Sequence, residues 1–306
     1  MSRFKILIAA ILSLTFVWWF LTRATLMGFV QGLLHVDAWV WGLVATGLLL
    51  SYGLRAWRIA HEFRSYEGMR FGVAFRVVLW HNASVNVMPF RTGEAAFPLL
   101  LRRAAGVPLV RSAATLLWLR LQDACTLLML GIWTWPQSSL LLRVTLSGIV
   151  LLGVAGLWWL ARRPGQWSLS ERWPRLSQLR EALAHASEHA QHSWLVTFSN
   201  WAIKLCVQAL VLQSVLQAAW GVGLAGALGA ELSALSPIQG VAGFGSYEAG
   251  SAAAMQLLGI DWVHGLQAAA LMHLVMLVSS LFWAALAWLW PGHQLDSSRF
   301  YEHIQS

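Results

Sequence analysis

The sequence predicts an all-α polytopic membrane protein, a fold class indicated by composition, by the length of the apolar runs and by an internal repeat. Of the 306 residues, 58% are hydrophobic and only 11% are charged, whereas an ordinary soluble domain has roughly 45–50% apolar residues. Nearly uncharged runs of 17 residues, such as 5–21 and 144–160, approach the roughly 20 residues that a helix needs to cross a bilayer. We therefore exclude a soluble protein and expect a single membrane domain over 1–306.

Ten apolar segments follow one another along the chain. They cover about 5–21, 38–54, 72–88, 90–104, 108–132, 139–160, 193–217, 219–236, 238–258 and 262–290. Two pairs of consecutive segments, 72–104 and 219–258, are interrupted by Pro and Gly, and we expect each pair to form a re-entrant helical hairpin. The expected fold has about six full transmembrane helices and two opposed hairpins, or about eight spans if the hairpins count as crossings.

The positive charges indicate the orientation in the membrane. Lys and Arg number 21 and Asp and Glu 13, a net charge of +8. Most basic residues lie between apolar segments, so we interpret them as topology signals and expect no nucleic-acid partner. Arginines cluster in the loop 55–70 and in the amphipathic segment 161–192, which we place in the cytoplasm together with both termini. The uncharged turn 133–139 then faces outward.

An internal repeat relates the two halves of the chain. Glu94 is followed after 12 positions by a glycine and after 14 more by Arg120, while Glu248 is followed after 11 by a glycine and after 14 more by His273. The repeat halves are 1–153 and 154–306. Under the expected topology the halves are inverted, and inverted repeats with broken membrane segments are typical of secondary transporters, whose substrate site lies near the midplane.

The first hairpin turns at 88–94, where Pro89 and Gly93 interrupt the helical pattern. Backbone groups at such a break lose their helical partners, and a membrane tolerates this only where the backbone is buried in protein or lines a wet cavity. Arg91 and Glu94 lie at the break. We therefore expect both to bind substrate or to couple transport to protons.

The second hairpin turns at 236–248, a glycine-rich stretch. Gly243 and Gly245 would let the backbone approach a ligand closely. A helix that starts near Ser246 would present its N–H groups to an anion. Glu248 occupies the place that matches the glutamate of the first hairpin, and we expect the two hairpins to face each other across one cavity.

Ionisable residues inside apolar segments are costly and are functional candidates by default. They are Arg91, Glu94, Arg120, Asp123, Lys204, Glu231 and Glu248. Arg120 and Asp123 lie three apart, share a helix face and would form a local pair, which either holds helices together or serves function. An Arg would hold a phosphate, a carboxylate would take or release a proton, and Lys204 would add a cation to the cavity.

Other polar residues have two interpretations. His81, Asn82 and Asn86 would satisfy the broken backbone of the first hairpin, which we favour, or line the substrate path; Glu231 would do either. The spacing of the histidines at 185, 189 and 192 suits a metal ion, but a solvated face explains it as well. We expect no metal and no cofactor.

Three short motifs carry a resemblance to a known family. The segments 89–94 (Pro-Phe-Arg-Thr-Gly-Glu), 120–123 (Arg-Leu-Gln-Asp) and 243–248 (Gly-Phe-Gly-Ser-Tyr-Glu) resemble, in order and spacing, the membrane region of lysylphosphatidylglycerol synthase, a flippase-like family of bacterial inner-membrane proteins. The chain departs from the pattern at Leu119, where the family has an acid, and at Ala242, where it has a glycine.

The resemblance implies translocation of a phospholipid or other anionic lipid across the bacterial inner membrane, with a membrane lipid as the substrate. Arg91 and Arg120 would hold the head group, while Glu94 and Glu248 would gate the path or couple to protons. No soluble acyltransferase domain is expected, so the resemblance implies transport rather than synthesis. The alternatives are an intramembrane lipid-modifying transferase, with Glu94 or Asp123 as base, and a non-catalytic partner of a lipid or glycolipid biosynthetic enzyme.

Overall fold

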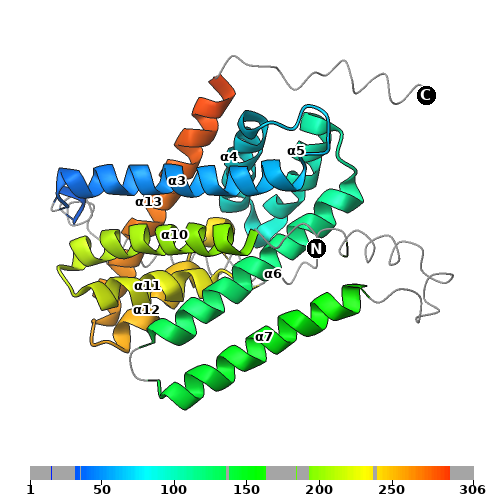
Figure 1. Ribbon diagram of the computed structural model, residues 1–306. Helices are drawn as coiled ribbons and strands as arrows, with labels where there is room; N and C mark the ends of the chain where they lie inside the picture. The colour runs from blue at the N-terminus through cyan, green and yellow to red at the C-terminus, as the bar shows by residue number, and fades with distance from the viewer. Residues whose placement is uncertain are drawn as a thin grey trace.

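The computed structural model describes residues 36–135, 138–162, 193–236 and 240–289, and in addition 15, 32–34 and 184. Within this part of the chain every regular element is a helix, which confirms the all-α fold (Figure 1). The elements are α3 (Ala38–Glu62), α4 (Phe71–Val87), η1 (Pro89–Ala95), α5 (Ala96–Ala105), α6 (Leu109–Thr134), α7 (Leu140–Arg162), α10 (Ser193–Leu216), α11 (Trp220–Ser233), η2 (Val241–Gly243), α12 (Ser246–Gln256) and α13 (Trp262–Leu289).

Four of the described helices are long and apolar enough to cross a membrane. They are Leu109–Thr134, Leu140–Trp159, Ser193–Leu216 and Trp262–Leu289, and each agrees with a segment predicted from the sequence. The polytopic membrane fold is therefore confirmed, while the number of crossings stays a prediction. The predicted first span 5–21 lies outside the described residues except for residue 15, as does the amphipathic segment 161–192 except for the end of α7 and residue 184.

Helix α3 is longer than its apolar run predicts. The expected loop 55–70 is wrong in its first half, because the helix continues to Glu62. Arg58 is buried in this extension, which packs beside α10 and α4, and Arg55 is partly buried. Both arginines therefore lie in the protein interior and are not cytoplasmic loop charges. The loop is limited to 63–70.

Two helical hairpins bring the broken segments together. In the first, α4 and α5 are joined through η1; in the second, α11 and α12 are joined through η2, and the two tips contact each other. Close packing depends on glycine: a Cβ on Gly93 would collide with the Ser84 carbonyl of α4, and Gly229 and Gly250 face each other across the second hairpin. The tips are thus held against their own arms.

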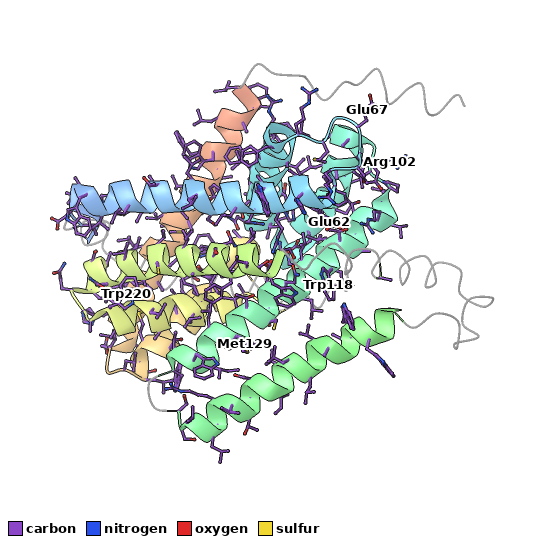
Figure 2. The ribbon with its side chains drawn as sticks, in the orientation of Figure 1. Glu62, Glu67, Arg102, Trp118, Met129 and Trp220 are labelled. Atoms are coloured by element: carbon purple, nitrogen blue, oxygen red, sulfur yellow. The ribbon has the colours of Figure 1, made fainter. Side chains whose placement is uncertain are left out.

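The packing defines an interior and an outer surface. Helices α3 and α10 lie side by side, and α6 passes α10 at an oblique angle (Figure 1). Their side chains fill the space between the helices, as Figure 2 shows. Helix α7 lies along α6 and exposes a row of apolar side chains, with Leu141 77% and Leu152 74% exposed, as expected of a surface that meets lipid.

The described elements follow the same order in both halves. A long helix (α3 or α10) precedes each hairpin, and another long helix (α6 or α13) follows it. Each hairpin ends at a left-handed glycine, Gly106 with φ 67° and Gly259 with φ 90°, a conformation that glycine adopts without steric cost. These are the glycines of the predicted repeat, whose division near residue 153 stays a prediction.

Candidate functional site

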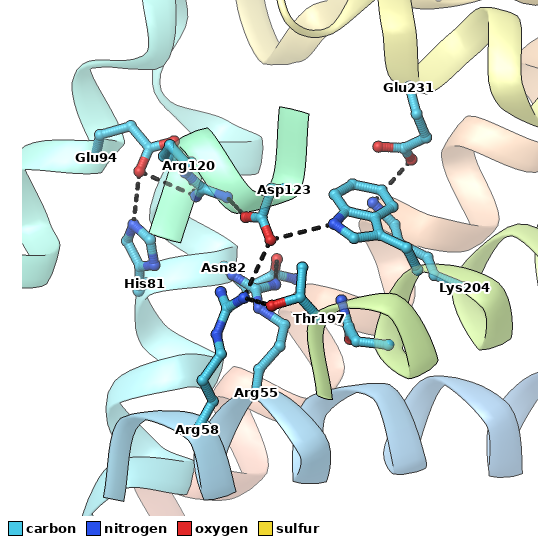
Figure 3. A network of polar contacts seen from close by, with 12 residues as sticks. Arg55, Arg58, His81, Asn82, Glu94, Arg120, Asp123, Thr197, Lys204 and Glu231 are labelled. Atoms are coloured by element: carbon cyan, nitrogen blue, oxygen red, sulfur yellow. Dashed lines mark hydrogen bonds and ion pairs between the residues drawn. The ribbon is translucent and has the colours of Figure 1, made fainter. Parts of the chain in front are cut away.

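A group of polar side chains lies close together in the interior between α3, α4, η1, α6 and α10 (Figure 3). We call it the Asp123 network. Its members are Arg55, Arg58, His81, Asn82, Glu94, Arg120, Asp123, Thr197 and Trp201.

Asp123 lies at the centre of this network. Its Oδ1 accepts hydrogen bonds from Arg58 Nη1 at 3.2 Å and from Trp201 Nε1 at 3.1 Å. Its Oδ2 accepts one from Arg120 Nη1 at 3.1 Å, which confirms the local pair expected from spacing. Arg58 also donates to the Thr197 hydroxyl. Because the carboxylate is buried, these donors compensate for the hydration that it has lost, and they connect α3, α6 and α10.

Glu94 joins the network from the tip of the first hairpin. Arg120 Nη2 lies 2.9 Å from its Oε1, and His81 Nε2 lies 3.1 Å from its Oε2. The side chains of Glu94 and Arg120 are 21% and 27% exposed, so this end of the network is partly accessible. The structure thus brings Glu94, Arg120 and Asp123 together, whereas the side chain of Arg91 lies outside the described residues.

A second cluster, the Glu231 network, consists of Lys204, Gln208, Glu231 and Tyr247. Lys204 Nζ lies 2.8 Å from Glu231 Oε1. The same oxygen accepts hydrogen bonds from Gln208 Nε2 at 2.6 Å and from the Tyr247 hydroxyl at 2.9 Å. Lys204 is therefore the counter-ion of Glu231, and its role as an additional cation of the cavity stays a prediction. Glu231, left open by the sequence, joins α10, α11 and α12.

Glu248 is fully buried at the tip of the second hairpin. Its Oε1 lies 2.6 Å from His273 Nδ1, and its Oε2 accepts the Gly245 N–H at 2.7 Å. Helix α12 begins at Ser246 as predicted, but the carboxylate of Glu248 already occupies part of its N-terminus. Gly243 and Gly245 have φ values of 82° and 90°. The backbone at these glycines thus lies close to the side chains of Glu248 and His273.

The two hairpins use the same arrangement of side chains. In each half a carboxylate at the hairpin tip contacts a basic residue on the long helix that follows: Glu94 contacts Arg120, and Glu248 contacts His273. These four residues are the anchors of the predicted repeat. The halves differ in chemistry, because a guanidinium presents several N–H donors in a planar fork whereas an imidazole offers a single nitrogen to the carboxylate.

Trp201 connects the two networks. Its indole N–H donates to Asp123, and Lys204 Nζ lies 4.8 Å from the centroid of its ring. This distance allows a cation–π interaction. The Asp123 network and the Glu231 network are therefore in contact through one aromatic side chain.

Sequence reasoning missed two arginines and left the partners of two asparagines open. Arg55 and Arg58 were read as loop charges, although their spacing of three places both on one helix face. Asn82 accepts a hydrogen bond from Arg55 Nη1 at 3.0 Å, and Asn86 donates to the Ser280 hydroxyl at 2.9 Å. Both asparagines thus bind side chains of neighbouring helices, and the interpretation that they satisfy hairpin backbone stays a prediction.

The charges suit an anionic ligand better than a metal ion. Within the described residues, His, Cys, Asp and Glu side chains form no group of three or more that could hold a metal. The histidines at 185, 189 and 192 lie outside that part of the chain. In the Asp123 network three guanidinium groups, those of Arg55, Arg58 and Arg120, face two carboxylates.

Fold and site together define a polytopic α-helical membrane protein with charged networks at the tips of two broken hairpins. The family model described as the lysylphosphatidylglycerol synthase transmembrane region matches residues 6–284. The chain belongs to this family, as its motifs predicted, and is a membrane protein connected with lipid metabolism or translocation. No curated protein and no solved structure matches the chain significantly.

Proposed function

We propose that this protein moves a phospholipid or other anionic lipid between the leaflets of the bacterial inner membrane. The observation that supports the proposal is the Asp123 network, a set of charged side chains at a hairpin tip within a helical bundle. Ionised groups inside a membrane are expensive and are kept where they bind or move charged ligands. Family membership supports a lipid as the ligand.

In this proposal the head-group phosphate enters at the partly exposed end of the Asp123 network. Arg120, bonded to both Glu94 and Asp123, exchanges a carboxylate for a phosphate oxygen, since a guanidinium binds either in the same planar geometry. Arg91 adds a second donor. Glu94 and Glu248, the tip carboxylates, gate the path or take up protons as their basic partners are drawn to the lipid.

Transport explains the bonding of the carboxylates better than a transferase does. A transferase would use Glu94 or Asp123 as a general base, which must have an oxygen free to receive the substrate proton. Asp123 accepts from three donors and Glu94 contacts both Arg120 and His81. Both carboxylates are thus engaged by basic side chains of the protein.

The proposal is tested with purified protein in liposomes, with the transbilayer movement of a fluorescent phosphatidylglycerol followed by quenching from outside. Glu94→Gln removes the charge that holds Arg120, and we expect transport to slow roughly tenfold or more, the equivalent of one charged hydrogen bond. Asp261→Asn is the matched control, because Asp261 is an exposed carboxylate paired with His264, and it should transport normally.

Three outcomes would contradict the proposal. Wild-type protein that moves no labelled lipid, with or without a pH gradient, would exclude transport under these conditions. A lipid product of changed mass that disappears in Glu94→Gln would indicate a transferase. Normal lipid movement in cells that carry Glu94→Gln or Arg91→Ala would point to a non-catalytic partner of a biosynthetic enzyme.

A further inference from the structure

Arg55 differs from the other two arginines of the Asp123 network in its bonding. Arg58 and Arg120 each contact a carboxylate, at 3.2 Å and 2.9 Å. Arg55 makes a single hydrogen bond, from Nη1 to the amide oxygen of Asn82 at 3.0 Å, and no ion pair with any described residue. The rest of its guanidinium N–H groups are available to a ligand.

The position of Arg55 makes this lack of a counter-ion costly. It lies on α3 one turn before Arg58, is partly buried, and points toward the same network (Figure 3). The charges of Arg58 and Arg120 act on it along with that of Asp123. A guanidinium among other cations in a desolvated region is unfavourable unless an anion compensates. A missing anion is therefore indicated beside Arg55.

The charge balance indicates which anion fits. With His81 neutral, the three guanidinium groups exceed the carboxylates of Glu94 and Asp123 by one positive charge. A phosphodiester carries one negative charge and neutralises this surplus, whereas a phosphate monoester carries up to two at neutral pH. A zwitterionic head group would bring an ammonium, for which the network offers no carboxylate that lacks a cation.

We propose that Arg55 and Asn82 form the binding site for a monoanionic phosphodiester. Arg55 donates to the phosphate oxygens through N–H groups that it does not use for Asn82, and the Asn82 amide NH₂ donates alongside it. This inference rests on the proposed function and names its substrate class, a glycerophospholipid without an amine. A small free phosphate compound would share the chemistry, and the experiment separates the two sources.

Binding is measured by titrating the purified full chain in detergent with dihexanoyl phosphatidylglycerol. Arg55→Gln should weaken binding at least tenfold, since it removes charge-assisted hydrogen bonds to the phosphate. Arg111→Gln is the matched control, because Arg111 lies on α6 and is paired with Glu62 at 3.1 Å, away from the network. It should bind as the wild type does, and an equal loss in both variants would overturn the proposal as non-specific attraction.

A second variant keeps Arg55 and remains informative if Arg55→Gln does not fold. Asn82→Asp has nearly the same shape and places a carboxylate where Arg55 now meets an amide oxygen. The internal anion should displace the phosphodiester, so lipid binding falls at least tenfold while the midpoint of thermal unfolding rises. Wild-type affinity in Asn82→Asp would overturn the proposal.

Further ligands identify the source of the phosphate. Inorganic phosphate and dihexanoyl phosphatidylcholine should each bind at least tenfold more weakly than dihexanoyl phosphatidylglycerol. Equal binding of inorganic phosphate would overturn a lipid ligand, and equal binding of phosphatidylcholine would overturn selection of a monoanion. Because the measurement needs no transport, a chain that binds through Arg55 but moves no lipid contradicts only the proposed function.

Discussion

Ala242 has a backbone conformation that suits glycine. It lies in η2 with φ 55° and ψ 19°, the left-handed region where a Cβ crowds the following carbonyl. The family pattern has a glycine at this position, and the next residue, Gly243, has φ 82°. The departure seen in the sequence therefore leaves local strain at the tip of the second hairpin.

Ala242→Gly should raise the free energy of unfolding by about 1 kcal/mol, because glycine adopts this conformation without the steric cost. The measurement is thermal or denaturant unfolding of the purified protein in detergent. Ala249→Gly, within α12, is the control and should lower stability by about 0.5–1 kcal/mol. If both variants lose stability equally, Ala242 is not strained.

Contacts between single residues were predictable where sequence spacing determines them. Arg120 with Asp123 follows from the helical repeat, and Glu94 with Arg120 agrees with the spacing that the halves share. The contact of Arg58 with Asp123 joins residues 65 positions apart, and no local pattern specifies such a pair. The contact of Lys204 with Glu231 likewise joins two different helices, so no local pattern specifies it.

At the scale of helices, the second hairpin is held together by small residues. The two glycines at the α11–α12 contact have no side chain, so the helix backbones approach closely, as in other membrane helix pairs. The first hairpin achieves the same approach only at its tip, through Gly93. The arms of the second hairpin are therefore closely packed along their length as well as near the tip.

Gly229→Ala should lower the free energy of unfolding by about 1–3 kcal/mol, because the new methyl group overpacks a close contact. Its Cβ would collide with the Gly250 carbonyl and lie 2.7 Å from the Ala254 Cβ. Gly221→Ala lies on the same helix with no atom within 4 Å of the added Cβ. It should leave stability unchanged or raise it by up to about 1 kcal/mol, and unfolding midpoints of the two variants compared in one detergent check the difference.

Helix positions were predicted well because apolar runs and Pro or Gly breaks mark them directly. The runs 108–132 and 193–217 correspond to α6 and α10 within a few residues. The predicted segment 38–54 ends before the charged residues, whereas helix α3 continues through them to Glu62. In the structure internal amide and carboxylate groups bind these arginines inside the protein, and hydropathy carries no information about such partners.

At the scale of the whole molecule, the orientation in the membrane is open to direct measurement. The loop 63–70 still carries Arg64 and Arg70, so the positive-inside bias places it in the cytoplasm. The turn that contains Ser139 connects the apolar helices α6 and α7 and lies at the opposite end of α6 from η1 and α5. We expect it outside.

Single cysteines at Glu67 and Ser139, both exposed, test this orientation. In a background where Cys125 and Cys206 are replaced by Ser, a membrane-impermeant maleimide should label Ser139→Cys in intact spheroplasts. Glu67→Cys should react only in inside-out vesicles. The reverse pattern would contradict the predicted orientation, and labelling of both sites from one side would contradict the single crossing expected for α6.

The indole of Trp201 cannot relay protons between the Asp123 network and the Glu231 network. Its N–H donates to Asp123 while its ring faces Lys204. The side chain therefore interacts electrostatically with a charged residue of each network. An indole nitrogen, however, has no lone pair with which to accept a proton, and a Grotthuss-type relay stops at this ring. Protons therefore cannot pass between the Glu231 network and Asp123 by way of Trp201.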